Sequence, residues 1–99
     1  MIQASTACHA LQKRLVLVLR YRGHRRLVEV HTVGITREQV EIMRAWQVAG
    51  GSVSGQPVGW KLIHLAEATE PEITDQPSQA PRPGYNPDDP AMVRIICRV

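Results

Sequence analysis

Alternation of apolar and polar residues with a period of two is the feature that most constrains the fold of this 99-residue chain. Residues 26–35 place Val28 and Val30 on one face of an extended segment and the residues between them on the other, which is the pattern of a β-strand. The preceding run, 15–21, is apolar and rich in strand-forming residues, and a turn over 22–24 follows it. The two segments therefore predict a β-hairpin.

Three further strands are predicted after this hairpin. Residues 40–48 alternate after a polar turn, residues 58–65 follow a loop rich in glycine and serine, and residues 68–75 form a strand that Pro71 confines to a sheet edge. Short strands at intervals of roughly ten residues indicate a small barrel or sandwich instead of a parallel sheet. The core is expected to contain Leu17, Leu19, Val28, Val30, Ile42, Trp46, Val48, Trp60 and Leu62.

The two ends of the chain are predicted to pack around these strands. Ser5 or Thr6 can cap a short amphipathic helix within residues 1–14. Residues 76–90 carry five of the seven prolines and are expected to wrap the surface in extended or turn conformations. Residues 91–99 alternate like a strand but follow an Asp-Asp-Pro sequence that favours the start of a helix, and a short C-terminal helix is the favoured prediction.

Length and composition predict one folded domain over residues 1–99. A hydrophobic content of 43% and a charged content of 21% argue against disorder. A domain of this size leaves roughly a third or more of its extended-chain surface exposed, so a homodimer is compatible with the sequence. There is no apolar run long enough to span a membrane, and the first six residues do not resemble a secretion signal, so a cytoplasmic location is expected.

The cysteines and histidines predict neither a disulfide framework nor a metal site. Cys8 and Cys97 stand near opposite ends and form no CxxC motif, so both are expected to be free thiols. The four histidines and two cysteines show no metal-binding spacing. We therefore predict no metal and no other cofactor.

Positive charge is concentrated in the first third of the chain. Seven basic residues precede Glu38, against the single acid Glu29, and the sign of the charge reverses between residues 38 and 75. This asymmetry suits an anionic partner at one end of the molecule, or head-to-tail pairing between copies.

The first hairpin turn carries the densest positive charge. Arg20, Arg22, Arg25 and Arg26 surround it, and Tyr21 lies among them. Such a cluster offers charge for phosphate contacts and an aromatic surface for stacking. The competing interpretation is a solvated turn that only raises solubility.

Arg44 shares a predicted strand face with Ile42, Trp46 and Val48. A guanidinium on such a face must be paired, stacked or directed into a ligand cavity. A buried partner such as Glu29, or a strand edge from which the side chain reaches water, explains this arginine as well as a ligand cavity does. Both alternatives are open from the sequence.

The glycine-rich loop over residues 50–55 excludes two catalytic motifs. It is followed by Gln56 instead of the lysine of a P-loop, and it lacks the final glycine of a nucleophile elbow. The backbone N–H groups of Gly50, Gly51 and Ser52 can hold an anion, or the loop is a plain connector. The chain is predicted not to be an enzyme.

Several short motifs resemble, in order and spacing, short bacterial proteins related to the WYL domain, and together they cover most of the chain after Leu11. They are Leu19-Arg20-Tyr21-Arg22-Gly23, residues 26–34, Arg44-Ala45-Trp46-Gln47-Val48, Gly50-Gly51-Ser52, Pro57-Val58-Gly59-Trp60-Lys61-Leu62, Pro81-Arg82-Pro83-Gly84-Tyr85 and Asp89-Pro90-Ala91-Met92.

The resemblance implies an SH3-like or Sm-like barrel of about five antiparallel strands, in agreement with the strand pattern. WYL domains are sensor modules in bacterial transcription regulators, often linked to phage defence or DNA damage, and are thought to bind nucleic acid or nucleotide-like ligands. By position, Trp60, Lys61 and Leu62 stand where the name-giving tripeptide is found, with lysine in place of its tyrosine. The family's winged-helix DNA reader does not fit before Leu15, so a freestanding sensor or a module that acts through a partner is expected.

Two functions from different classes are therefore predicted. The first is a regulatory ligand-sensing module that binds nucleic acid or a nucleotide-like anion, with Tyr21 or Trp46 stacking on the ligand. The residues expected to hold the anion are Arg22, Arg25, Arg26, Arg44 and Lys61. The alternative is a protein–protein interaction module with no ligand of its own, in which a sheet edge or residues 76–90 engage a partner.

Overall fold

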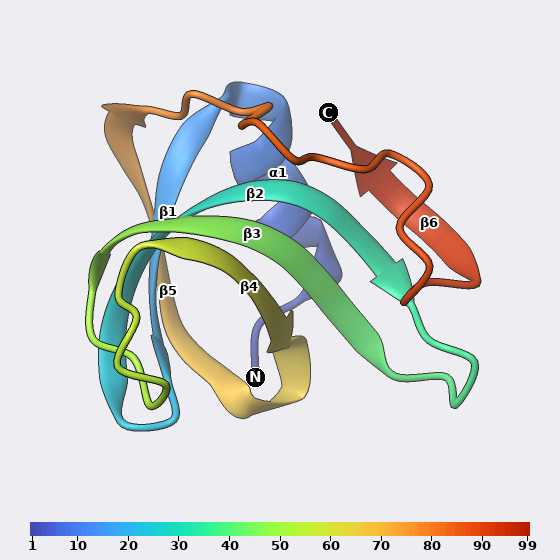
Figure 1. Cartoon of the computed structure of the whole chain (residues 1–99), viewed down its shortest axis with the longest axis horizontal. Coiled ribbons are helices and arrows are strands. Elements are labelled where there is room, and N and C mark those ends of the chain that lie inside the picture. The colour runs from blue at the N-terminus through green and yellow to red at the C-terminus, as the bar shows by residue number, and fades with distance from the viewer.

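The computed structural model describes all residues, 1–99, and shows one helix packed against a strongly curved antiparallel sheet (Figure 1). The elements are α1 (Ala4–Lys13), β1 (Leu15–Tyr21), β2 (His24–Ile35), β3 (Glu41–Gly50), β4 (Gly59–His64), the 3₁₀ turn η1 (Leu65–Glu67), β5 (Ala68–Pro77) and β6 (Arg94–Arg98). The strand order is β4-β3-β2-β1-β5, with β6 paired to β2 beside this path. The prediction of a mainly β, barrel-like fold with a short N-terminal helix is confirmed.

The helix α1 begins earlier than the sequence suggested. Its N-cap is Gln3, which makes no side-chain capping bond, so the predicted caps at Ser5 or Thr6 are wrong. The start is fixed by packing instead, because Ile2 is buried and its N–H donates to the carbonyl oxygen of Leu65 at 3.0 Å. The helix ends at Arg14, which adopts the left-handed conformation.

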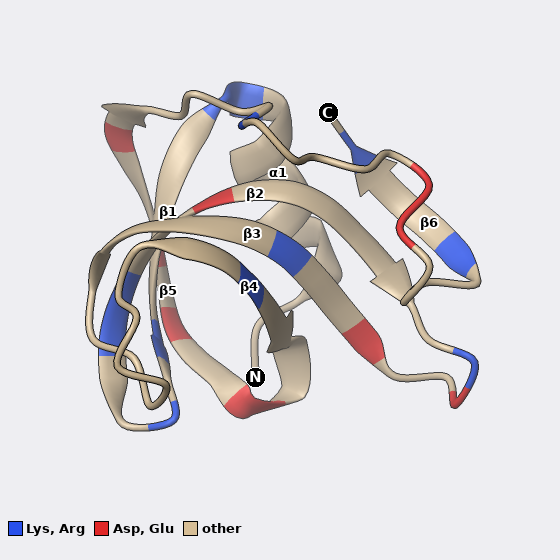
Figure 2. Ribbon diagram, in the orientation of Figure 1, with Lys and Arg blue, Asp and Glu red and all other residues tan.

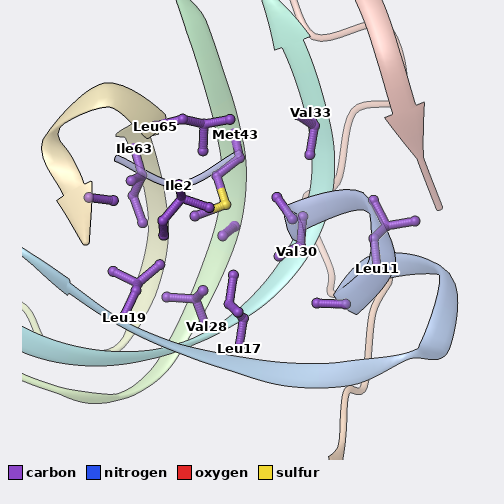
Figure 3. Close-up of a cluster of buried hydrophobic side chains, with 14 of the residues drawn as sticks. Ile2, Leu11, Leu17, Leu19, Val28, Val30, Val33, Met43, Ile63 and Leu65 are labelled. Carbon is purple, nitrogen blue, oxygen red and sulfur yellow. The ribbon is translucent and has the colours of Figure 1, made fainter. Parts of the chain in front are cut away.

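The core lies between α1 and the inner face of the sheet (Figure 3). The predicted core residues of the first hairpin, Leu17, Leu19, Val28 and Val30, are all buried there. Their burial follows from the alternation along β1 and β2, which places every second side chain on the same face of the sheet. Ile42 of β3 is also buried, as predicted.

The predicted face of β3 is wrong for Trp46. Met43 and Ala45 are the residues of β3 that join the core, whereas Trp46 lies half-buried on the other face, beside Trp60 of β4. Both faces of β3 are apolar and both are covered, so alternation alone could not distinguish the inner one. The other predicted core residues that are only partly buried are Val48, Trp60 and Leu62.

The C-terminal residues form the strand β6, so the predicted helix at this end is wrong. β1 pairs only with the first part of β2, as far as Val28, and leaves the edge of β2 beyond it free. β6 pairs with that edge, opposite residues 32–35. The Asp-Asp-Pro sequence makes only a single turn, in which the carboxylate of Asp89 accepts the N–H of Ala91.

Cys8 and Cys97 form a disulfide, so the expectation of two free thiols is wrong. Cys8 lies on the buried side of α1, and the pairing of β6 with β2 brings Cys97 next to this helix. The residues lie 89 positions apart, and only the three-dimensional path of the chain brings them together.

The proline-rich residues between β5 and β6 have no regular secondary structure. We call residues 78–92 the strap, because they return from the end of β5 to the start of β6 across the outer face of the sheet (Figure 1). The one α-helix, α1, has ten residues and is too short to span a membrane.

Breaking the disulfide should reduce the stability of the fold. We expect Cys97→Ser to lower the free energy of unfolding by roughly 2–5 kcal/mol, because a cross-link that closes so long a loop restricts the unfolded chain. Urea unfolding followed by tryptophan fluorescence measures this loss. The Cys8→Ser/Cys97→Ser double variant is the control and should not respond to a reductant. Equal urea midpoints for the wild-type protein with and without reductant would contradict the expectation.

Candidate anion-binding site

Basic residues gather at the end of the barrel where the β1–β2 hairpin turns, and acidic residues follow β5 (Figure 2). At this end lies an open cavity of about 260 Å³, which we call the mouth cavity. The residues that line it are Tyr21, Arg22, Arg26, Ser52, Val53, Ser54 and Lys61. The structure thus brings together five of the residues predicted from the sequence, from the first hairpin, the β3–β4 loop and β4.

Arg26 is a buried cation without an acidic partner. Only 3% of this residue is exposed, and its Nε donates to the carbonyl oxygen of Tyr21 at 3.2 Å. Its Nη1 donates to Oε1 of Gln47 at 3.4 Å, and no carboxylate lies within 4 Å. Burial lowers the pKa of Arg26, because removal from water disfavours the charged form. An uncompensated buried charge is costly, and an anion in the mouth cavity would offset that cost.

Lys61 supplies a second cation whose contacts are all neutral. Its Nζ donates to Oγ of Ser52 at 3.0 Å, to Oγ of Ser54 at 3.3 Å and to the carbonyl oxygen of Gln56 at 2.6 Å. The loop oxygens therefore occupy positions around the ammonium group that oxygens of an anionic ligand could take. The two serine hydroxyls also offer O–H donors to such a ligand.

Tyr21 positions the arginines and is closed to a stacking base. The tyrosine is only 5% exposed, and its ring centre lies 5.3 Å from the guanidinium carbon of Arg22 and 5.1 Å from that of Arg26. Its hydroxyl accepts the N–H of His64 at 3.3 Å. Arg22 also faces Glu67 at 3.8 Å, but both side chains are about half exposed, so this ion pair is weak.

The glycines of the β3–β4 loop serve its close approach to β2, and the structure gives them no anion-binding nest. Gly50 belongs to β3 with φ of 105°, and a Cβ there would collide with the backbone of Arg25. The N–H of Gly51 donates to the carbonyl oxygen of Arg25 at 3.1 Å, so it is not free for an anion. Gln47 holds the loop in place through its Nε2, which donates to the Gly51 carbonyl oxygen at 2.9 Å. Ser52 is the member of the predicted anion loop that reaches the mouth cavity.

Arg25, another of the predicted anion-binding residues, faces a different part of the surface. It lines a separate hollow together with Arg20, Glu70 and Glu72. Arg20 pairs with Glu70 at 3.4 Å, and the two acids offset the positive charge in this hollow. Glu70 and Glu72 come from β5, the edge strand that pairs with β1. The alternation of residues along each strand does not show which strands pair, so the sequence could not place these acids beside Arg25.

Arg44 and Trp46 lie on the outer face of β3, away from the mouth cavity. Arg44 forms a bidentate ion pair with Asp89 of the strap, with Nε–Oδ2 at 2.7 Å and Nη2–Oδ1 at 3.2 Å. Asp89 is only 5% exposed, and the hydrogen bonds from Arg44 lower the pKa of its carboxyl. The structure thus gives Arg44 a buried carboxylate partner, which is Asp89 and not Glu29. Arg44 also lines an open cavity of about 280 Å³ next to this ion pair, so the ligand-cavity interpretation stays a prediction.

Glu29, His31 and Arg82 form a second polar cluster on the outer face of the sheet, which the sequence analysis missed. Arg82 of the strap donates to Glu29 at 2.7 and 3.2 Å. The Nε2 atom of His31 accepts the backbone N–H of Arg82 at 2.9 Å, and Nδ1 donates to the carbonyl oxygen of Glu29 at 2.9 Å. His31 is therefore held in the neutral form, and burial lowers its pKa. The sequence signal for this cluster was an acid, Glu29, within an apolar strand. Its partner Arg82 lies 53 residues away, so the sequence did not identify the pair.

No protein-family model, curated protein or solved structure matches the chain. No group of three or more His, Cys, Asp or Glu side chains is arranged to hold a metal ion.

Protonation of His31 should destabilise the protein at mildly acidic pH. The unfolded chain binds a proton near pH 6.5, whereas the folded protein binds it only at lower pH, so stability falls as the pH drops below about 6.5. This residue contributes a slope of up to about 1.4 kcal/mol per pH unit. Urea unfolding from pH 7 to 5 should show this slope in the wild-type protein and a smaller slope in His31→Gln. Parallel profiles for the two proteins would refute the assignment.

Proposed function

We propose that the chain is a regulatory ligand-sensing module that binds a phosphate-bearing, nucleotide-like anion in the mouth cavity. The observation that carries this proposal is the buried guanidinium of Arg26, which has no acidic partner and lines the cavity. By contrast, Arg44 and Arg82, the two ion-paired arginines that are less than a third exposed, each have a bidentate carboxylate partner. The structural arginines Arg44 and Arg82 therefore each have a carboxylate to neutralise their charge, whereas Arg26 has no carboxylate partner.

The chemistry around Arg26 suits a phosphate group. Arg22 and Lys61 add two more cations to the same cavity, and Ser52 and Ser54 add hydroxyl groups. Charge-assisted hydrogen bonds from arginine and lysine to phosphate oxygens are among the strongest that proteins make. A carboxylate ligand would use fewer of these donors, because it has two oxygens where a terminal phosphate has three.

The arrangement favours a compact ligand over a nucleic-acid strand. Strand binding needs a basic groove that follows several phosphates, together with open aromatic faces. Here Arg25 faces Glu70 and Glu72, and Arg44 is neutralised by Asp89. Of the predicted anion-binding cations, only Arg22, Arg26 and Lys61 therefore share one cavity, and they form a cluster and not a track. The cavity of about 260 Å³ fits one phosphate group with part of the molecule that carries it.

The resemblance to WYL-related proteins supports a sensing role within this proposal. Its cytoplasmic setting stays a prediction, and the Cys8–Cys97 disulfide counts against it because disulfides persist mainly in oxidising compartments. Ligand binding through Arg26 and Lys61 requires neither a cytoplasmic nor an oxidising compartment.

Calorimetric titration with adenosine monophosphate, pyrophosphate and adenosine tests the proposal. We expect the two phosphate compounds to bind and adenosine not to bind. Arg26→Gln and Lys61→Gln should each weaken binding by roughly 10- to 100-fold, which is the effect of losing one charge-assisted hydrogen bond. Arg25→Gln removes the same charge outside the mouth cavity and should leave the affinity unchanged.

Three results would count against a compact phosphate ligand. The first is the absence of binding by either phosphate compound at low salt. The second is an equal loss of affinity in Arg25→Gln and Arg26→Gln, which would indicate a diffuse effect of net charge. The third is tight binding of a single-stranded oligonucleotide with log K falling against log salt at a slope of about −3, because that slope reports about four phosphate contacts. Thermal melting of each variant verifies that it is folded.

A further inference from the structure

The strap lies on the outer face of β2, β3 and β4 as a peptide lies in a binding groove. It has no helix or strand of its own, and Pro81 and Pro83 are exposed while Arg82 between them points inward. The groove beneath is lined by the rings of His31, Trp46 and Trp60, from β2, β3 and β4, and Tyr85 of the strap packs against the His31 ring.

A buried carboxylate, that of Glu29, forms the floor of the groove, and a single arginine of the strap, Arg82, is paired with it. Glu29 is 1% exposed, and its Oε1 and Oε2 accept Nε and Nη2 of Arg82 in a bidentate pair. Oε2 also accepts the backbone N–H of Gln79 at 2.7 Å. The guanidinium carbon of Arg82 lies 5.6 Å from the ring centre of Trp46, within the range of a cation–π contact. An arginine is therefore specified by charge, by bidentate geometry and by an aromatic face.

The groove also binds the backbone of the strap, on both sides of this arginine. The Nε2 of His31 accepts the N–H of Arg82, and Nε1 of Trp60 donates to the carbonyl oxygen of Pro83 at 3.3 Å. A Cβ at Gly84 would lie 3.0 Å from Nε1 of Trp60, and the φ of Gly84 is 92°, so a glycine is favoured at this position. These contacts do not involve β1, α1 or the mouth cavity.

We propose that this outer face is a peptide-binding groove for an extended arginine- and proline-containing segment of a partner protein, and that the strap occupies it in cis. The resident residues 79–84 define the ligand chemistry as an arginine between prolines, followed by glycine. Aromatic grooves that bind proline-rich segments, with an acid to receive an arginine, are a recurring mode of peptide recognition. Because the strap is tethered at both ends, its high effective concentration keeps the groove closed to weak competitors.

Weakening the strap should open the groove to the same sequence supplied in trans. The probe is a fluorescent peptide with the sequence of residues 78–87, and its binding to full-length protein is followed by anisotropy. We expect Arg82→Gln protein to bind it at least tenfold more tightly than wild-type protein. The matched control Arg37→Gln removes a charge from a distant turn and should behave like the wild type. A peptide with glutamine in place of its arginine should not bind.

A second variant guards against failure of Arg82→Gln to fold. Gly84→Ala strains the strap, because alanine disfavours a φ of 92° and its Cβ would crowd Nε1 of Trp60. It leaves Glu29 and its pairing chemistry intact, so this variant should bind the same peptide. Adding Glu29→Gln to either variant should abolish the binding. The proposal fails if neither folded variant binds the peptide, or if the arginine and glutamine peptides bind equally. It is also overturned if light scattering shows that the variants dimerise by exchanging straps, because the occupant is then a second copy. None of these outcomes depends on the mouth cavity.

Discussion

The strand β2 is longer than its partner β1. The arrangement of the C-terminal third of the chain depends on this difference in length. β2 has twelve residues, but β1 pairs with it only as far as Val28. The unpaired N–H and C=O groups beyond that point need partners, and β6 supplies them opposite residues 32–35. From the end of β5 the chain reaches this edge by crossing the outer face of the sheet as the strap, in contact with His31 and Trp60. The same pairing brings Cys97 to α1, where it meets Cys8.

Three buried or half-buried arginines show how the fold separates structural charges from free ones. Arg44 pairs with Asp89 and Arg82 pairs with Glu29, and in each pair a nearly inaccessible carboxylate receives two hydrogen bonds. Such pairs are costly to break from one side, so they hold the strap in register on the sheet. Arg26 contacts only neutral groups, namely the Tyr21 ring and the oxygens of Tyr21 and Gln47, at the open end of the barrel. Its missing counter-charge distinguishes the mouth cavity from the ion pairs of the outer face.

The sequence could predict features that depend on local periodicity, and it failed where distant segments meet. Val28 and Val30 were assigned correctly because alternation along one strand determines its faces once a hairpin is recognised. For β3 this was not enough, since the strap covers a second apolar face, where Trp46 lies. The candidate site divides in the same way. Arg22 and Arg26 are close along the chain and stay together, whereas the neutralisation of Arg44 comes from a residue 45 positions away.

The mouth cavity and the peptide groove lie on opposite faces of the same strands, and this placement allows the two proposed sites to be coupled. On β3, Gln47 contacts Arg26 at the mouth while its neighbour Trp46 faces the groove. On β4, Lys61 lines the mouth while Trp60 binds the strap. A ligand that shifts Gln47 or Lys61 therefore acts on backbone that also positions Trp46 and Trp60. Coupling of this kind is reciprocal, so an anion that raises the affinity of the groove for a partner peptide by a given factor must itself bind more tightly, by the same factor, when the peptide fills the groove. A module built in this way would convert the presence of a phosphate compound into the availability of a protein-binding surface.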